Sequence, residues 1–427
     1  MNKVVNKVKT LKGTIVVPGD KSVSHRAVMF SALTRGKSLI SGLSTGKDCM
    51  STIDVIRQSG CTVDFIDDTT VEVSSDGILK KSEKPLYCGN SGTSMRLFSG
   101  IFAGQNFETV LTGDDSLSKR PMKRVIEPLS AMGAKILHRD FKAPLNIFGG
   151  NLHGINYVSK IASAQVKSAV LAAGLFAEGE TSFTEPFRSR NHSELMLKYL
   201  GADIEQKSDV TTVIRKSGLI PQNIEVCGDI SSAAYFIVAA LIAPGADILI
   251  KNVGVNPTRT GILDVVKAAG GNLEILNERI LSSEPVADLR VKYTENLKAT
   301  VVSGSLIPRL IDEIPVIALL AALSDGQTVI KDAEDLKNKE SDRIKSTVAQ
   351  LSAIGADIVA TDDGMLINGK KSLEGGVSVD SGKDHRTAMT LYTAGLVCRN
   401  SVEIKDFEWV DISFPEFERL MSEISVL

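Results

Sequence analysis

The sequence predicts an α/β protein of two domains, each built from three copies of one repeated unit. The chain has 427 residues, which is too many for a single hydrophobic core. Mostly apolar helices recur along it, and each begins with a polar or glycine-bearing segment. Each helix stops at a glycine or polar residue and is followed by a short strand such as T-S-F-T-E or Q-T-V-I-K-D.

The repeated unit occurs six times, with starts near residues 19, 89, 163, 228, 312 and 382. The first copy reads G-D-K-S-V-S-H-R-A-V-M-F-S-A-L-T-R-G, and the last reads G-K-D-H-R-T-A-M-T-L-Y-T-A-G-L-V. Between copies lies a second, more amphipathic helix that ends in Gly or Gly-Ala, which is a C-cap signal, and leads into a hairpin. We therefore predict units of the βαβαββ type.

The two ends of the chain complement each other. The last copy, F-E-R-L-M-S-E-I-S-V-L, stops before its final strands, whereas the chain begins with two strand-like segments, V-N-K-V-K-T and G-T-I-V-V. We expect the N-terminus to complete the last unit. The predicted domains are 18–227 and 1–17 combined with 228–427, with the active site in the cleft between them.

Composition limits the classes of function. The formal net charge is −2, so nothing predicts general attraction to nucleic acid or membrane surfaces. The cysteines are far apart, without a C-x-x-C pair, which argues against a metal site or a disulfide framework and suits a reducing cytosol. The N-terminus lacks the apolar core of a signal peptide, and no apolar run is long enough to span a bilayer. We expect a soluble cytoplasmic protein.

The starts of the apolar helices carry cations that need an explanation. If the repeats are structural, these helix N-termini gather on one face of each domain, where their dipoles favour anionic ligands. Capping alone would account for Ser22, Asn90 and Asp229. It does not account for cations, which oppose the dipole unless an anion is bound. These cations are Lys21, Arg26, Arg96 and Arg386.

Seven motifs, in order, resemble those of the 5-enolpyruvylshikimate-3-phosphate synthases. They are G-D-K-S-x-S-H-R, G-N-S-G-T-S-M-R, S-L-S-K-R-P-M, S-A-Q-V-K, L-I-D-E-I-P, N-K-E-S-D-R-I and D-H-R-T-A-M. The resemblance runs from about residue 12 to the C-terminus. It implies the inverse α/β barrel fold of the enolpyruvyl transferases, with two similar domains. It also implies transfer of the enolpyruvyl group of phosphoenolpyruvate to the 5-hydroxyl of shikimate 3-phosphate, with release of phosphate.

Both substrates of that reaction are polyanions, which suits arginines and lysines. The resemblance implies that shikimate 3-phosphate is bound by Lys21, Ser22, Arg26, Ser163, Ala164, Gln165, Arg190, Asp312 and Lys339. It implies that phosphoenolpyruvate is bound by Lys21, Asn90, Gly92, Arg120, Gln165, Arg343 and Arg386. Gly92 fits a site where backbone must approach a ligand closely.

Addition followed by elimination moves protons in both directions, so acid and base groups are required. The resemblance assigns these roles to Asp312, near the attacking hydroxyl, and Glu340, near the methylene carbon, with Lys339 and Lys21 assisting. From the residues alone, Asp312 is an N-cap and Glu340 belongs to a solvated loop or helix start. His25 and His385 receive no chemical role.

The sequence departs from the family pattern at two positions. Ile412 stands where some relatives have a lysine, and Ala164 replaces a serine found in many members. The segments G-D-K-S, S-A-Q-V-K, R-N-H-S-E and N-P-T-R resemble the glyphosate-tolerant class II, although Gly92 is retained where one tolerant relative has alanine. This predicts reduced sensitivity to glyphosate as an inhibitor.

Other functions remain as alternatives. The UDP-N-acetylglucosamine enolpyruvyl transferases carry Lys-Asn where this chain has Lys21-Ser22, and many have a cysteine before the Arg-Pro that is absent here. The RNA 3'-terminal phosphate cyclases need a nucleotidyl-accepting histidine that no motif supplies. A non-catalytic anion-binding scaffold is the third alternative. No dinucleotide fingerprint or P-loop is present, so we expect no organic cofactor, and we expect no metal. We also expect the protein to be a monomer.

Overall fold

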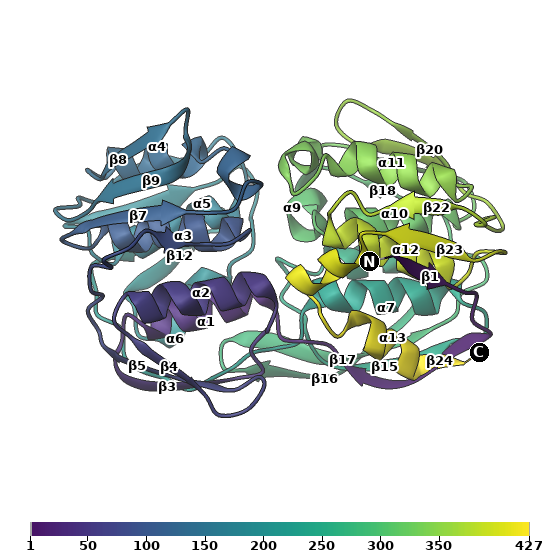
Figure 1. The fold of residues 1–427 in the computed structure, drawn as a ribbon, viewed down its shortest axis with the longest axis horizontal. Coiled ribbons are helices and arrows are strands. Elements are labelled where there is room, and N and C mark those ends of the chain that lie inside the picture. Colours follow the sequence, from purple (N-terminus) through teal and green to yellow (C-terminus); the bar gives the residue numbers. More distant parts are fainter. Residues whose placement is uncertain (1, 427) are drawn as a thin grey trace. The chain divides into compact units, whose positions relative to one another are not determined.

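The structure is a computed structural model that describes residues 2–426. The chain divides into two compact units. The N-terminal unit consists of Gly19–Val226 and Leu281–Glu284, and the C-terminal unit of Met1–Pro18, Cys227–Ile280 and Pro285–Leu427 (Figure 1). Within the described residues, no helix is both long and apolar enough to cross a membrane.

The N-terminal unit contains three four-stranded mixed sheets. In each sheet the first strand is parallel to the second, and the other pairs are antiparallel. In sheet order, the strands of the first sheet are β14 (Ile224–Glu225), β3 (Arg35–Ser41), β5 (Val71–Asp76) and β4 (Thr62–Phe65). Those of the second are β6 (Leu86–Tyr87), β7 (Glu108–Thr112), β9 (Lys142–Phe148) and β8 (Lys135–Arg139). Those of the third are β10 (Asn156–Val158), β11 (Glu180–Thr184), β13 (Thr211–Arg215) and β12 (Ile204–Ser208).

The C-terminal unit contains three further sheets, of five, four and three strands. In sheet order, the strands of the five-stranded sheet are β16 (Asn272–Leu281), β17 (Glu284–Lys292), β15 (Asp247–Gly254), β2 (Thr10–Val16) and β24 (Ser425–Val426). Those of the four-stranded sheet are β18 (Val301–Val302), β19 (Gln327–Ile330), β21 (Met365–Asn368) and β20 (Asp357–Ala360). Those of the three-stranded sheet are β1 (Lys3–Val5), β23 (Val402–Lys405) and β22 (Ser378–Asp380).

The N-terminal strands take two different places in this unit. β1 pairs antiparallel with β23 and so completes the sheet of the last repeat, as the sequence predicts. β2 instead pairs parallel with β15 and antiparallel with β24. β2 therefore connects the fourth repeat with the C-terminal end of the last one. The fourth repeat lacks a first strand of its own, and β2 supplies it.

Each repeat begins with a buried helix, as predicted from the apolar runs. These inner helices are α1 (Lys21–Ser31), α3 (Gly92–Ala103), α5 (Ala164–Gly174), α7 (Ile230–Ile242), α10 (Ile314–Ala322) and α12 (His385–Gly395). Every residue of α7, α10 and α12 is buried. α3 packs on α5 so closely that a Cβ at Gly100 would lie 2.0 Å from the carbonyl oxygen of Ala169. Only glycine fits there.

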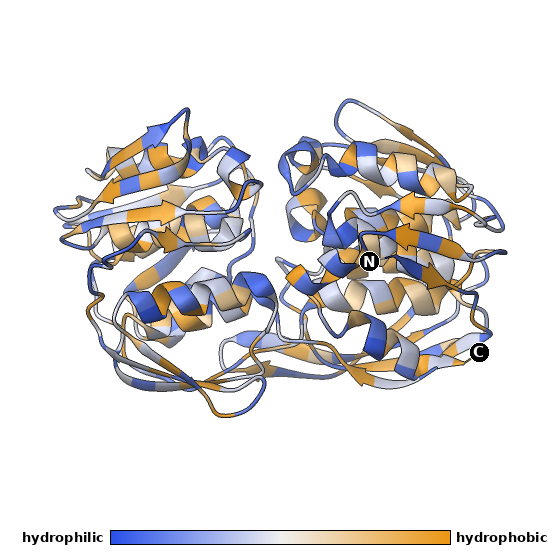
Figure 2. Ribbon diagram, viewed as in Figure 1, coloured by the Kyte–Doolittle hydropathy of each residue, from blue (hydrophilic) through white to orange (hydrophobic). Residues whose placement is uncertain are grey.

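The remaining helices have one buried face, except η2, which has no buried residue. They are α2 (Lys47–Gln58), α4 (Lys123–Ala131), α6 (His192–Tyr199), α8 (Gly261–Ala268), α9 (Ile307–Leu310), α11 (Arg343–Ala353), α13 (Phe417–Ile424) and the 3-10 helices η1 (Leu117–Lys119), η2 (Gly304–Leu306), η3 (Glu334–Asn338) and η4 (Phe407–Ile412). Figure 1 shows α1 and α2 side by side over the sheet that contains β3, β4 and β5. Strand residues alternate between hydrophobic and hydrophilic (Figure 2), as expected for sheets with one packed face.

The helix caps differ in part from the prediction. Asp229 caps α7, as expected. Ser22 and Asn90 are not caps, because Asp20 caps α1 and Ser91 caps α3. In both cases the capping side chain accepts a backbone N–H of the first turn, so Ser22 and Asn90 are not needed for capping.

Candidate active site

Lys21 is the first residue of α1, and its ammonium group is held by a carboxylate. Its Nζ lies 3.1 Å from Asp48 Oδ2 on α2, and the two side chains are 18% and 9% exposed. No sequence motif predicts Asp48 as a site residue. It lies well beyond the motif of Lys21 in the sequence, and only the packing of α1 against α2 brings the two together.

Arg26 lies one turn further along α1 and is 2% exposed. Its guanidinium donates to Ser193 Oγ at 2.7 Å, to Ser168 Oγ at 2.7 Å and to the Ser22 carbonyl at 2.8 Å. Burial lowers the pKa of Arg26 to about 10, and nearby acidic groups such as Glu194 oppose this shift. Arg26 is thus a charged group that ties α1 to α5 and α6.

Asn90, Gly92 and Arg120, three residues predicted to act together, do lie together. Arg120 Nη2 donates to Asn90 Oδ1 at 2.6 Å, and Asn90 Nδ2 donates to Asp114 at 2.7 Å. A Cβ built on Gly92 would lie 3.4 Å from Arg120 Nη1 and 2.8 Å from Nη1 of Arg96. The glycine therefore leaves room beside two guanidinium groups.

Gln165 lies at the start of α5 and contacts α3. Its Oε1 accepts a hydrogen bond from Arg96 at 2.6 Å, and its Nε2 donates to Thr93 Oγ1 at 3.0 Å. The predicted residues Ser163 and Ala164 come directly before it, with Ser163 in the N-cap position but making no side-chain cap hydrogen bond. The start of this helix therefore offers backbone N–H groups to a ligand.

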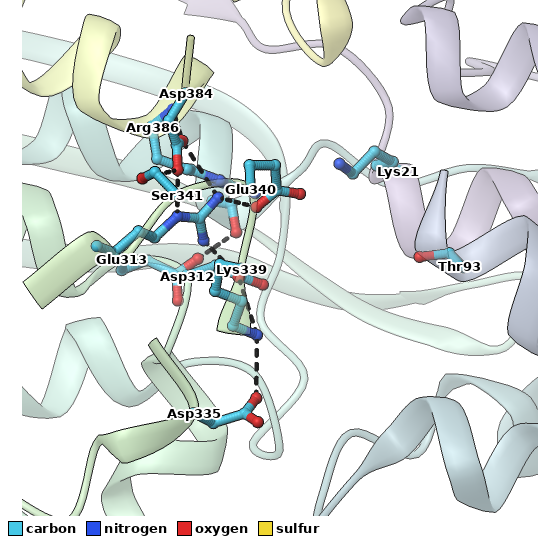
Figure 3. Close-up of polar contacts among 12 residues, drawn as sticks. Lys21, Thr93, Asp312, Glu313, Asp335, Lys339, Glu340, Ser341, Asp384 and Arg386 are labelled. Carbon is cyan, nitrogen blue, oxygen red and sulfur yellow. Dashed lines mark hydrogen bonds and ion pairs between the residues drawn. The ribbon is translucent and has the colours of Figure 1, made fainter. Parts of the chain in front are cut away.

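Arg343, the first residue of α11, is the centre of the candidate site in the C-terminal unit. Its guanidinium donates from Nε to Asp384 Oδ2 at 2.8 Å, from Nη2 to Glu340 Oε2 at 2.6 Å and from Nη1 to Asp312 Oδ1 at 3.3 Å. Lys339 Nζ lies 3.9 Å from the same Asp312 oxygen. Figure 3 shows these carboxylates and Lys339 grouped together.

Charge decides the protonation states in this group. Burial opposes the charged form of Arg343, but the surrounding carboxylates outweigh it and raise the pKa of the guanidinium above its ordinary value. Burial likewise disfavours the ionised form of Asp384, yet the guanidinium of Arg343 outweighs it and lowers the pKa of that carboxyl below its usual range. We infer that both groups are charged at neutral pH.

Arg386 is positioned by the cap of α12. Asp384 Oδ1 accepts the Arg386 backbone N–H at 2.9 Å, so the residue that anchors Arg343 also starts this helix. Tyr235 on α7 lies near Arg386; burial raises the pKa of this phenol to about 12, although the arginine opposes the shift. Asp384 was part of a quoted motif but received no role in the sequence analysis.

The three carboxylates around Arg343 differ in their exposure to solvent. The side chain of Asp384 is 0% exposed, whereas those of Asp312 and Glu340 are 18% and 19% exposed. Only Asp312 and Glu340 can therefore reach a ligand. These two were the predicted acid–base residues. The alternative reading of Asp312 as a helix cap is wrong, because Glu313 holds the N-cap position of α10.

The other predicted positions are less distinctive. Arg190 lies half-buried in the loop between β11 and α6. Ile412, at the end of η4, is buried, so the position where some relatives have lysine is part of the core here. Within residues 2–426, no group of three or more His, Cys, Asp or Glu side chains could hold a metal ion.

His25, next to Arg26, gives a pH-dependent prediction. It is fully buried, and its Nδ1 lies 2.7 Å from Thr52 Oγ1. Burial, with Lys21 and Arg26, holds its pKa well below the ordinary 6.5. The unfolded chain therefore takes up this proton below pH 6.5 while the folded chain does not, which lowers the free energy of unfolding as the pH falls.

We expect a His25→Gln variant to lose less stability between pH 7 and pH 5 than the wild type. The difference in slope should approach about 1.4 kcal/mol per pH unit, the limit for one proton. Urea titrations at several pH values measure both slopes. Equal slopes would show that His25 titrates normally in the folded protein.

The chain is similar to known proteins over almost its whole length. The family model for EPSP synthase (3-phosphoshikimate 1-carboxyvinyltransferase) matches residues 5–421. The 3-phosphoshikimate 1-carboxyvinyltransferase of Thermoanaerobacter sp. strain X514 is 52% identical over 415 residues, 97% of both chains. The EPSP synthase structure from Acinetobacter baumannii superposes with a TM-score of 0.89 at 41% identity, covering 100% of this chain and 98% of that one. The enolpyruvyl transferase NikO from Streptomyces tendae, at 16% identity, gives a TM-score of 0.80 over 99% of this chain and 96% of that one.

The fold is that of the enolpyruvyl transferases, an α/β fold with six small mixed sheets. The chain belongs to the EPSP synthase family. It is accordingly a 3-phosphoshikimate 1-carboxyvinyltransferase of the shikimate pathway, which serves aromatic amino acid biosynthesis, and its substrates are shikimate 3-phosphate and phosphoenolpyruvate. The predicted reaction is confirmed, and the nucleotide-sugar and scaffold alternatives are set aside.

Proposed function

We propose that the site residues named above bind the two substrates and that two of them transfer the protons of the reaction. The observation that carries this proposal is the Arg343 guanidinium, which holds two accessible carboxylates, Asp312 and Glu340, beside Lys339. Such a group can place two proton carriers at fixed positions. The proposed lobes are 18–227 and 1–17 with 228–427, each of three repeats in an inverse α/β barrel. The compact units support them, although Leu281–Glu284 groups with the N-terminal unit.

For shikimate 3-phosphate, the proposed contacts are Lys21, Ser22, Arg26, Ser163, Ala164, Gln165, Arg190, Asp312 and Lys339. The helix N-termini at α1 and α5 support this assignment, because their N–H groups favour anions. A guanidinium has more N–H donors than the three that Arg26 gives to the protein. Arg26 can thus hold its serine partners and still donate to the substrate.

For phosphoenolpyruvate, the proposed contacts are Lys21, Asn90, Gly92, Arg120, Gln165, Arg343 and Arg386. The contact between Arg120 and Asn90, and the space left at Gly92, support a compact anion site in the N-terminal unit. Ile412 is not among the contacts, because its apolar side chain has no group that can pair with an anion. The arginines already present supply the positive charge.

The proposed mechanism assigns one proton transfer to each accessible carboxylate. As the 5-hydroxyl oxygen bonds to C2 of phosphoenolpyruvate, Asp312 takes the hydroxyl proton, and Glu340 delivers a proton to the methylene carbon. In the second step, the C2–O bond to phosphate breaks, the methyl carbon returns a proton to Glu340 to regenerate the double bond, and the proton held by Asp312 leaves with the phosphate. Lys339 and Lys21 stabilise the negative charge.

The direct test compares two acceptors. Purified protein is given phosphoenolpyruvate with either shikimate 3-phosphate or UDP-N-acetylglucosamine, and phosphate release is measured. We expect release only with shikimate 3-phosphate. Release only with the nucleotide sugar would contradict the assignment of Lys21 and Ser22, and no release from a folded sample with either acceptor would contradict the proposed chemistry.

We expect this enzyme to be of class II and to show reduced sensitivity to glyphosate. The motifs that carry the class, and Ala164 in S-A-Q-V-K, support the assignment. Gly92 argues in the other direction, because it leaves space beside Arg96 and Arg120. The inhibition constant for glyphosate against phosphoenolpyruvate decides the matter, and a value in the range of sensitive bacterial enzymes would reject the class.

A monomeric state and a cytoplasmic location complete the proposal. Cys49, Cys61, Cys88 and Cys398 are buried free thiols, which suits a reducing compartment. Sedimentation of the purified protein tests the monomer, for which the expected mass is 45.7 kDa.

A further inference from the structure

Lys167 is a buried cation on the first turn of α5 that the proposed mechanism does not use. Its side chain is 2% exposed. Its Nζ lies 2.7 Å from Glu185 Oε1 and 2.8 Å from Glu194 Oε1, and it donates to the Ser189 carbonyl at 3.3 Å. The ammonium group is engaged by its hydrogen bonds to Glu185 and Ser189 and by its ion pair with Glu194. Lys167 is therefore placed to hold protein groups and not a ligand.

The three acceptors bracket the loop that carries Arg190. Glu185 directly follows β11, Ser189 lies in the loop, and Glu194 lies in the first turn of α6. Glu185 Oε1 also accepts the Ser189 backbone N–H at 2.9 Å. One ammonium group thus fixes the beginning, the middle and the end of the segment 185–194.

The same buried cluster includes Arg26. The partners of its guanidinium, Ser168 and Ser193, are the sequence neighbours of Lys167 and Glu194. The two carboxylates around Lys167 leave one negative charge in excess, and the attraction between Glu194 and Arg26 offsets it. The cluster therefore joins α1, α5 and α6 through buried groups of alternating charge.

Stability alone does not account for such a cluster. Replacing a buried ion pair by apolar side chains of similar volume is often neutral or stabilising. The cluster includes Arg26 and adjoins, along the chain, the other proposed shikimate 3-phosphate contacts of the N-terminal unit: Ser163–Gln165 at the start of α5, and Arg190.

We propose that Lys167 is a positioning residue for shikimate 3-phosphate, because it fixes the Arg190 loop against the start of α5. This inference rests on the proposed assignment of Arg190 to that substrate. Lys167 touches neither substrate. It acts by holding Arg190 in the geometry that a bidentate phosphate contact requires.

The test uses a charge-balanced variant, Lys167→Met with Glu185→Gln, which removes one positive and one negative charge. We expect the dissociation constant for shikimate 3-phosphate to rise about tenfold or more, while the KM for phosphoenolpyruvate stays within about twofold. The control is Val170→Ala, which truncates a buried apolar side chain on the same helix. It should lower the melting temperature without changing either constant.

A second arm distinguishes this inference from the proposed site. Arg190→Ala should weaken shikimate 3-phosphate binding by a similar factor, and adding it to the charge-balanced variant should cause little further loss, because both act through one group. If Arg190→Ala has no effect, the proposed site is wrong. If Arg190→Ala weakens binding but the charge-balanced variant binds normally, or weakens both substrates equally, the inference about Lys167 is overturned. Should that variant not fold, Glu194→Gln replaces it in the same comparison.

Discussion

The Glu340→Gln variant should fold like the wild type and release phosphate about 10²–10⁴ times more slowly. The amide has the size of the carboxyl group and can still accept the hydrogen bond that Arg343 Nη2 makes to Glu340 Oε2 at 2.6 Å. It cannot hold a transferable proton. The rate of addition should fall for this reason, while substrate binding should change little. Phosphate release under saturating substrates measures the effect, and circular dichroism checks the fold.

Asp342→Asn provides the matched control. Asp342 is an acidic neighbour of Glu340 that caps α11 by accepting the Lys345 backbone N–H, and it makes no ion pair with Arg343. Asparagine is an equally good cap. We expect its turnover to stay within about twofold of the wild type. A Glu340→Gln rate within tenfold of the wild type would remove Glu340 from proton transfer.

The repeated helices could be predicted from sequence because a fully buried helix needs apolar residues on all sides. A helix such as α10, in which every residue is buried, must be apolar on all sides, and its glycine or polar boundaries mark its ends. Strand partners were harder to predict. β1 and β2 are separated by only a few residues, yet they enter different sheets. Such a choice depends on which sheet lacks a strand, and no local signal carries that information.

Only those residues of the candidate site that belong to a sequence motif could be predicted. Asp312, Glu340 and Arg343 belong to motifs and do lie together. From the residues alone, Glu340 is predicted to lie in a solvated loop or helix start, because its neighbours in the sequence are charged. Residues that hold the others in place, such as Asp48 beside Lys21, carry no motif of their own and appear only when helices pack.

The Arg343→Lys variant should lose both stability and activity, although it keeps the charge. The guanidinium reaches Asp312, Glu340 and Asp384 from different nitrogen atoms, and a lysine ammonium is a single point of charge that cannot span them. We expect Asp384, whose side chain is 0% exposed, to lose its charge partner. Leaving such a buried charge unpaired costs about 3–5 kcal/mol. The melting temperature should fall, and the KM for phosphoenolpyruvate should rise.

Arg290→Lys separates this effect from the general difference between arginine and lysine. Arg290 also donates from two nitrogen atoms to one carboxylate, that of Asp247, at 3.0 Å and 2.8 Å. The two side chains are 43% and 39% exposed, respectively. Water replaces a lost contact there, so we expect little change in melting temperature and none in kinetics. If Arg343→Lys behaved like Arg290→Lys, the central guanidinium would not be organising the carboxylates. Loss of turnover without loss of stability would instead mean that Arg343 acts mainly on substrate and that Asp384 finds another partner.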